Sequence, residues 1–170
     1  GAVAAVQHIR NPVLLAEAVM QKSPHVFLTG AGACEFAKQQ GLEEAPDEYF
    51  FSQFRYNQWQ QIKETDGYAL DHSTSETLQK EKKFGTVGAV ACDALGNIAA
   101  ATSTGGMTNK SFGRIGDTPI IGAGTFADNK TCAVSCTGHG EPFIRAVAAH
   151  AVSCLMEYKQ LSLKEAMEEI

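Results

Sequence analysis

The pair Gly85-Thr86 stands where a long polar stretch of the sequence ends and an apolar one begins. A threonine hydroxyl inside a chain is a poor nucleophile, because no neighbouring group need take its proton. If the bond between the two residues were cut, Thr86 would gain a free α-amino group with a pKa of about 8, a base on the same residue as the hydroxyl. The glycine tolerates a strained backbone and leaves room for the hydroxyl to attack. The pair therefore fits a threonine nucleophile that self-cleavage releases.

A second hydroxyl is expected near the first. The β-type segments TVGAVAC and IAAATST flank DALGN, whose Asp, Gly and Asn are typical of a hairpin loop. If Cys92 faces Ile98 across this loop, counting outward along both strands brings Thr86 opposite Thr104. The sequence thus predicts that two threonine hydroxyls meet at the open end of a hairpin.

Short strands and helices are expected before the hairpin. GAVAAVQHI favours a strand, and Asn11-Pro12 supplies an N-cap and a first-turn proline to the helix PVLLAEAVMQK, which Ser23-Pro24 ends. The apolar stripe of that helix comprises Leu14, Leu15, Ala18 and Val19. HVFLTG then favours a buried strand, and AGACEFAKQQG a helix that Gly41 ends.

A further helix is expected over residues 46–62, with aromatic side chains that form core or packing surface. Residues 63–85 are charged and poor in large apolar groups, which predicts a mobile connector. After the hairpin, the sequence predicts a loop at TNKSFGRIGDTP and short strands at IIGAG and CAVSC. A long helix should run from about Pro142 to Lys159, and another should begin at Ser162, whose Glu165 completes a capping box.

Composition excludes several classes of function. The 170 residues, 44% of them hydrophobic, suffice for one domain, and a net charge of −5 with interspersed signs argues against a nucleic-acid or membrane surface. No apolar run approaches the roughly 20 residues of a membrane helix, and no signal peptide is evident, so a cytoplasmic protein with a small-molecule partner is expected. The five cysteines suit reduced thiols, and no Cys or His set has zinc-site spacing, so no metal is expected. GAGACE is only half of a dinucleotide fingerprint and is better interpreted as a helix start.

The sequence from Gly85 onward contains GTVGAVACDALGNIAAATSTGGMTNKSFGRIGDTPIIGAGTFAD and AVSCTGHGEPFIRA. This segment resembles the plant-type asparaginase and isoaspartyl peptidase family of N-terminal nucleophile hydrolases, and GAVAAVQHIRNPVLLAEAVMQKSPHVFLTG resembles the end of that family's α subunit. The resemblance implies an α+β fold, a four-layer αββα sandwich in one domain over 1–170, incomplete at both ends. Residues 1–85 would end the α subunit, and residues 86–170 would begin the β subunit.

The resemblance also implies the chemistry. Thr86 would be the nucleophile, freed by self-cleavage after Gly85, and Thr104 would be the second hydroxyl that touches it. L-asparagine and β-aspartyl dipeptides would be hydrolysed through a β-aspartyl ester, without a cofactor. The aspartyl end of these substrates carries one α-carboxylate and one α-ammonium group.

The motif GRIGD would bind that end of the substrate. Arg114 would hold the carboxylate in a bidentate contact and Asp117 would accept from the ammonium, with Gly116 between them. Taken in isolation, the motif would be better interpreted as a surface Arg and Asp pair, and the resemblance reverses that preference.

The motif TGHG ends a strand and opens a helix. Thr137 and the amides around Gly138 and Gly140 would therefore point at a developing oxyanion or at the polar end of the substrate, helped by the helix dipole. His139 lies between two glycines, and the free amine already fills the role of base, so no direct part in the chemistry is expected of it.

Family members are longer than this chain, and both of its ends look cut. The loop that holds a structural sodium or other alkali ion in the family would lie outside it. The resemblance further implies an αβ heterodimer that pairs into (αβ)2.

Three alternatives stay open. Glycosylasparaginases share the threonine chemistry, but their nucleophile typically follows Asp. Taspase-like proteases lack the acid of GRIGD. A non-catalytic or unprocessed relative would only bind a small anion at its Gly-rich loops.

Overall fold

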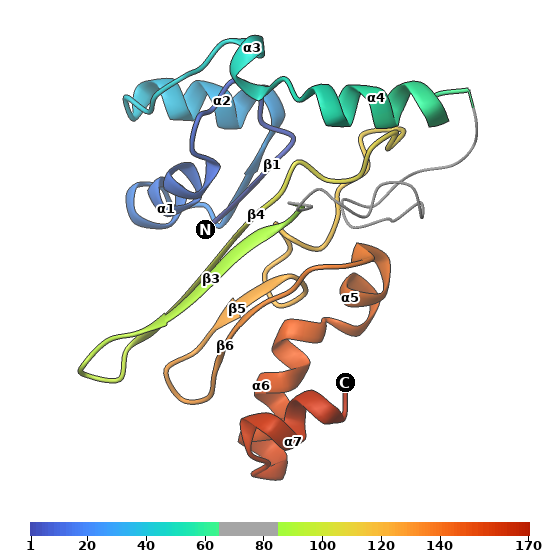
Figure 1. Cartoon of the computed structure of the whole chain (residues 1–170). Helices are drawn as coiled ribbons and strands as arrows, with labels where there is room; N and C mark the ends of the chain where they lie inside the picture. The colour runs from blue at the N-terminus through green and yellow to red at the C-terminus, as the bar shows by residue number, and fades with distance from the viewer. Residues whose placement is uncertain (65–84) are drawn as a thin grey trace. The chain divides into compact units, whose positions relative to one another are not determined.

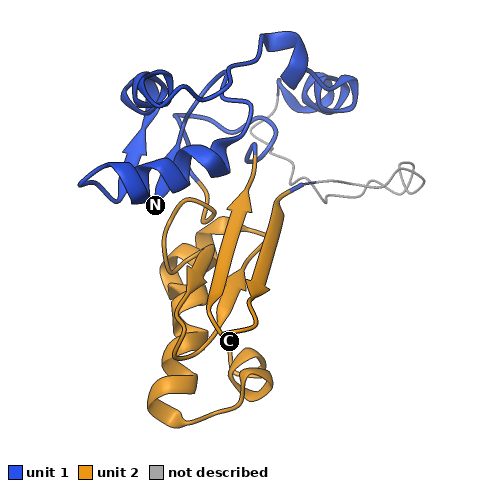
Figure 2. Cartoon of the chain, turned by 90° about the vertical axis from the view of Figure 1, so that its left-hand side faces the viewer, with its two compact units in different colours: residues 1–85, 105–115 blue, residues 86–104, 116–170 orange. Residues whose placement is uncertain are grey.

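The computed structural model of the chain describes residues 1–64 and 85–170 (Figure 1). Most of the connector expected over 63–85 therefore lies outside the described residues. The chain forms two compact units, shown in Figure 2. The first unit comprises Gly1–Gly85 and Gly105–Ile115, and the second comprises Thr86–Thr104 and Gly116–Ile170.

The first unit begins with a βαβ arrangement. Strands β1 (Ala2–Ala4) and β2 (Phe27–Thr29) pair in parallel, and helix α1 (Pro12–Lys22) connects them. The strand expected at the amino end is confirmed but short, because Ala5 and His8 turn the chain with φ angles of 52° and 63°.

Helix α1 begins and ends where its sequence predicts. The Asn11 side chain accepts hydrogen bonds from the backbone N–H groups of Val13 and Leu14, and Ser23 is the C-cap. The expected stripe is correct for Leu15, Ala18 and Val19, which are buried, and wrong for Leu14, which is 47% exposed.

Replacing this cap gives a first prediction. Asn11→Ala removes the acceptor for two amides of the first turn, so the free energy of unfolding should fall by about 1 kcal/mol. Chemical denaturation checks this value, with Gln21→Ala on the exposed face of the same helix as a control. Equal stability of the two variants would contradict the capping role.

Helix α2 (Gly30–Gln39) packs Ala33 and Ala37 against Leu15 of α1. Gly41 ends it as expected, with φ 69° and its N–H donating to the carbonyl of Lys38. Strand β2 was expected to be buried, and this is wrong, since Phe27 and Thr29 are both exposed. Within the described residues, β2 pairs only with β1.

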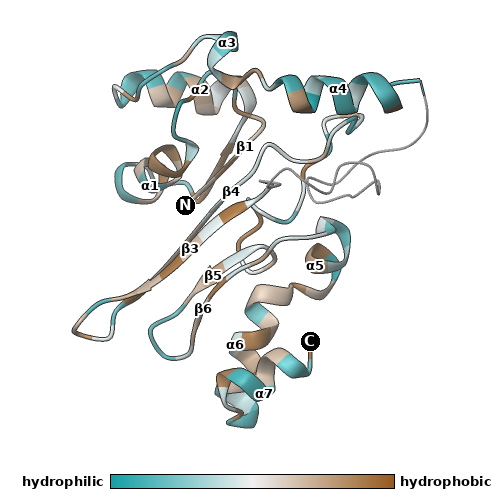
Figure 3. Ribbon diagram, viewed as in Figure 1, coloured by the Kyte–Doolittle hydropathy of each residue, from teal (hydrophilic) through white to brown (hydrophobic). Residues whose placement is uncertain are grey.

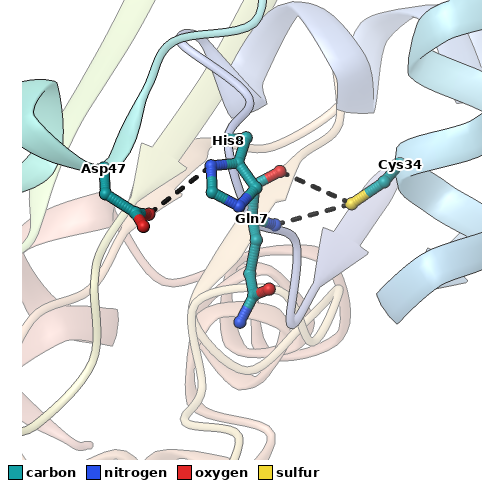
Figure 4. A network of polar contacts seen from close by, with 4 residues as sticks. All are labelled: Gln7, His8, Cys34 and Asp47. Carbon is teal, nitrogen blue, oxygen red and sulfur yellow. Dashed lines mark hydrogen bonds and ion pairs between the residues drawn. The ribbon is translucent and has the colours of Figure 1, made fainter.

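Polar contacts anchor the loop after β1 to the helices that follow (Figure 4). The backbone N–H of Gln7 donates to the Cys34 sulfur at 3.5 Å, and that thiol donates to the Gln7 carbonyl at 3.6 Å. The His8 Nδ1 lies 3.6 Å from the Asp47 carboxylate. The turn at Gln7 and His8 is therefore held by side chains on α2 and on the next helix.

The single helix expected over 46–62 is two helices, α3 (Asp47–Phe50) and α4 (Gln53–Ile62). Ser52 breaks it, because its side chain accepts from the Arg55 N–H and so starts a new helix. The aromatic residues are not core: Tyr49, Phe50 and Trp59 are between 39% and 55% exposed.

The second unit begins with the expected hairpin. Strands β3 (Val87–Cys92) and β4 (Ile98–Ser103) are antiparallel, with Cys92 opposite Ile98. This confirms the predicted register. In the loop, the Asp93 carboxylate accepts hydrogen bonds from the side chain and backbone of Asn97 and from the Leu95 N–H, which lower its pKa.

A second hairpin consists of β5 (Thr125–Ala127) and β6 (Ala133–Ser135). The strand expected at CAVSC is confirmed at its centre. The strand expected at IIGAG is wrong, since the amides of Ala123 and Gly124 both bond back to the Ile120 carbonyl in a turn, and β5 begins only at Thr125.

The long helix expected from Pro142 to Lys159 is also two helices, α5 (Gly140–Ala146) and α6 (Ala148–Lys159). Val147 separates them with φ 49°. The amides of Ala149 and His150 donate to the carbonyls of Ala123 and Gly122, so the start of α6 is fixed by the turn before β5. Helix α7 (Leu163–Glu168) starts with the predicted capping box.

Helices α6 and α7 cover β5 and β6. The core between them consists of Cys132, Val134, Ala149, Val152 and Ala166, and α6 is correspondingly more hydrophobic than α4 in Figure 3. The combination of helices and strands agrees with the α+β class expected from the sequence. Among the described residues, no helix has the length and hydropathy needed to cross a bilayer.

Candidate active site

The two hairpins of the second unit lie with their tips together. The side chain of Asn129, in the β5–β6 loop, accepts from the Ile98 N–H at 2.8 Å and donates to the Asn97 side chain at 3.1 Å. The opposite, open ends of the hairpins are also close, because Thr102 near the end of β4 is hydrogen-bonded to Ser135 at the end of β6. The start of β3, the end of β4 and the end of β6 therefore bring Thr86, Thr104 and Thr137 to one end of the unit.

Thr86 and Thr104 form a direct contact. The Thr86 hydroxyl donates to the Thr104 hydroxyl at 3.3 Å, and both residues are half-buried. The contact continues the β3–β4 register by one pair beyond Val87 and Ser103. The predicted meeting of two hydroxyls at the open end of the hairpin is thus confirmed as geometry.

A second set of hydroxyls holds the two hairpins against each other. Thr102 on β4 lies 2.8 Å from the Ser135 hydroxyl on β6, and the Thr125 hydroxyl on β5 donates to Thr102 at 2.6 Å. Gly88 on β3 also lies close to β6, because a Cβ there would be 1.9 Å from the Ser135 oxygen. Strand β3, which directly follows Thr86, is therefore positioned by β6.

Asp117 is a carboxylate that is only 6% exposed. Its carbonyl accepts from the Ile120 N–H, and Gly124 packs directly on it. The Asp117 carboxylate also affects Cys136, the residue before TGHG. The pKa of the Cys136 thiol is raised, mainly by burial and to a smaller extent by the charge of Asp117. A buried carboxylate therefore lies near Cys136, the residue before Thr137.

The TGHG segment follows β6 and opens α5. Thr137 is exposed, Gly140 is buried, and Gly138 has φ 145°, a conformation that side chains rarely adopt. A Cβ on Gly138 would also lie 3.1 Å from the Phe143 ring. His139 is the N-cap residue of α5, but its side chain makes no capping hydrogen bond. The sharp turn therefore requires glycine at position 138.

The remaining residues of GRIGD divide between the units. Arg114 is half-buried in the first unit, and its backbone N–H donates to the Ser111 carbonyl at 3.0 Å. Gly116, half-buried, begins the second segment of the second unit, next to Asp117.

The first unit contains a pocket of about 580 Å³. Aromatic side chains of α3, α4 and the turn between them line one side, and Gly85 and residues 105–109 line the rest; the aromatic residues are Phe50, Phe51, Tyr56 and Trp59. The pocket thus includes the residue before Thr86 and the loop that follows Thr104.

Sequence reasoning missed the Thr102, Thr125 and Ser135 network and the contacts of α4 with the loop after Thr104. The network joins residues 23 and 33 positions apart, so no local spacing could reveal it. The aromatic residues of α4 were noticed, but their exposure and their pocket were not predicted.

Gly124 offers a second prediction. A Cβ at this position would lie 2.5 Å from the Asp117 backbone and 2.7 Å from its carboxylate, so Gly124→Ala must displace Asp117. The added methyl group overpacks this turn, so the free energy of unfolding should fall by about 1–3 kcal/mol. Gly32→Ala is the control, because a Cβ there would have open space around it and should not lower stability. A free energy of unfolding that is unchanged in Gly124→Ala would refute the prediction.

Cys136 offers a third prediction, which concerns pH. Because the Asp117 carboxylate disfavours the thiolate, Asp117→Asn should lower the pKa of Cys136, and alkylation of this thiol near pH 8 should become faster. The exposed Cys92 serves as an internal reference whose rate should not change. Peptide mapping after timed iodoacetamide treatment measures both rates. A slower reaction at Cys136 would contradict the assignment.

Comparison with known proteins agrees with these features. The model of the asparaginase family matches residues 1–170, so the chain belongs to this family. It is 54% identical over 170 residues to an isoaspartyl peptidase of Escherichia coli, covering all of this chain and 53% of the relative. It is 53% identical over 170 residues to an isoaspartyl peptidase of Salmonella typhimurium, and the match covers 100% of this chain and 54% of that relative. It is 46% identical over 157 residues to an isoaspartyl peptidase/L-asparaginase of Danio rerio, and the match covers 92% of this chain and 48% of that relative. The chain spans about half the length of these curated relatives.

Proposed function

We propose that the protein is a threonine hydrolase that cleaves its own chain between Gly85 and Thr86 and then hydrolyses L-asparagine and β-aspartyl dipeptides. The observation that carries the proposal is the Thr86 hydroxyl in contact with the Thr104 hydroxyl, at the same end of the unit as TGHG. The names of the relatives support both substrate classes, since they include isoaspartyl peptidase and isoaspartyl peptidase/L-asparaginase.

The reaction has two steps. The free amine of Thr86 takes the proton of its own hydroxyl, and the oxygen attacks the side-chain carbonyl carbon of the substrate. Ammonia or an amino acid leaves with the proton that the amine held, and a β-aspartyl ester to Thr86 remains. Water then hydrolyses the ester and releases aspartate. Thr104 donates to or accepts from the Thr86 oxygen and keeps it oriented for attack.

The other site residues bind the substrate. Arg114 pairs with the α-carboxylate, and Asp117 accepts from the α-ammonium, with Gly116 shaping the loop between them. Burial of Asp117 supports this role, because a buried carboxylate is stabilised by a cationic partner. Thr137 and the amides at Gly138 and Gly140 stabilise the oxyanion or hold the polar end of the substrate.

No cofactor takes part in this scheme. The complete fold is proposed to be a four-layer αββα sandwich, and the cleaved αβ pair is proposed to associate as (αβ)2. The cytoplasmic location and the lack of a nucleic-acid partner remain predictions.

Mass spectrometry and an activity assay of the full-length protein test the proposal. We expect a fragment whose first residue is Thr86, together with release of aspartate from asparagine and from a β-aspartyl dipeptide. An uncut chain would instead favour a non-catalytic relative. Activity only on glycan-linked asparagine would favour the glycosylasparaginase alternative.

A further inference from the structure

The loop that follows Thr104 is held by helix α4. The Thr108 hydroxyl donates to the side-chain carbonyl oxygen of Gln58 at 2.6 Å, and the Asn109 side chain donates to the Ile62 carbonyl at 3.2 Å. Both hydrogen bonds are partly buried and join residues 50 and 47 positions apart. We call this pair of hydrogen bonds the α4–loop contact.

Residues 105–110 form no helix or strand, and Thr108 takes part in an isolated β-bridge. Gly106 and Asn109 have φ angles of 82° and 63°, and the Lys110 side chain bonds back to the Gly105 carbonyl. A non-glycine residue in the left-handed region is held there by its surroundings, and the bond from Asn109 to Ile62 provides such a restraint. The two hydrogen bonds from the loop to α4 therefore contribute to the conformation of residues 105–109.

Gln58 is well placed to act as the anchor. Its side-chain oxygen accepts a second hydrogen bond, from Arg55 Nη1 at 3.2 Å, one turn earlier on the same helix. A carbonyl oxygen that accepts from a guanidinium and from a hydroxyl is fixed in one rotamer, and the charged donor strengthens the interaction. Gln58 thus presents a rigid acceptor to Thr108.

The α4–loop contact crosses the proposed cleavage point. Helix α4 precedes Gly85 in the sequence, whereas the loop follows Thr86 and is bonded directly to Thr104. We propose that Gln58 is a positioning residue, which acts through Thr108 and the loop to keep the Thr104 hydroxyl against the Thr86 hydroxyl after the chain is cut. The inference rests on the proposed function. Helix α4, which precedes the cleavage point, would then still support the reaction after the chain is cut.

Kinetics of the full-length, self-cleaved protein test this role. Gln58→Met keeps the length of the side chain and removes the acceptor, so kcat for a β-aspartyl dipeptide should fall roughly tenfold with little change in KM, as expected for loss of one hydrogen bond. Gln58→Glu keeps an oxygen acceptor and should therefore retain most of the wild-type kcat. Gln61→Met, at an exposed position of the same helix, should leave kcat unchanged.

A double-mutant cycle separates positioning from simple stability. Thr108→Val should lower kcat as much as Gln58→Met, and the double variant should lose no more than either single variant. Hydrogen exchange of residues 105–110 should accelerate in Gln58→Met and not in Gln61→Met. The inference would be overturned if the loss of kcat in the double variant equalled the product of the two single losses. It would also be overturned if Gln58→Met lowered the thermal midpoint and left kcat unchanged. A wild-type protein without hydrolytic activity would instead refute the proposed function on which the inference rests.

Discussion

Thr86→Ala in the full-length protein is expected to yield a single uncut chain without hydrolytic activity. The change removes the oxygen that attacks in both self-cleavage and substrate hydrolysis, so no other described group replaces it. Loss of a nucleophile lowers kcat by roughly 10,000-fold or more. Mass spectrometry reports the cleavage, and aspartate release reports the turnover.

The matched variant Thr86→Ser keeps the hydroxyl and loses only the methyl group. It should cut itself and retain part of the activity, which separates the need for the oxygen from any effect on folding. Thr104→Val should self-cleave slowly or turn over slowly, because the bond to the Thr86 hydroxyl is lost while the shape is kept. Full activity of Thr86→Ala would exclude Thr86 as the nucleophile.

Asp117→Asn is expected to lower kcat/KM for asparagine and β-aspartyl dipeptides by about 100- to 5,000-fold. The carboxylate is 6% exposed, and removing one member of a buried charge pair costs about 3–5 kcal/mol. The loss should appear mainly in KM, because the ammonium is bound in the ground state as well as in the transition state. Steady-state kinetics at pH 7.5 would provide both constants.

The control is Glu48→Gln, because the side chain of Glu48 is exposed and should tolerate the change. A substrate analogue without the α-amino group offers a sharper comparison. Wild type and Asp117→Asn should bind it with similar affinity, because the analogue carries no ammonium group for Asp117 to recognise. A large loss for this analogue too would show that Asp117 supports the fold of the site and not the recognition of the ammonium.

Local signals in the sequence predicted the elements whose ends are fixed by adjacent residues. Asn11 caps α1, Gly41 ends α2 and Ser162 begins α7, in each case through hydrogen bonds within a few positions. The β3–β4 register followed from one loop, and it placed Thr86 opposite Thr104 without knowledge of the fold.

The errors occurred where distant residues decide the outcome. Helices α5 and α6 are separate because amides at 149 and 150 bond to the turn at 122–123, and no pattern near Val147 signals this. Phe27 in strand β2 is exposed although it is apolar, whereas Leu28 is half-buried, since burial depends on what packs over each face of a strand. For the same reason, the hydroxyl network around Thr102 and the Gln58 contact could not be found from spacing.

The joined tips of the two hairpins have a practical consequence. Leu95 in the first tip is 88% exposed, and the strands separate it from the open end where Thr86 and Thr104 meet. A fluorophore or affinity handle attached at position 95 would thus report on the protein without entering its chemistry. The length of β3 and β4 keeps such a label away from Thr86 and Thr104, which makes this tip a suitable attachment point for immobilising the protein.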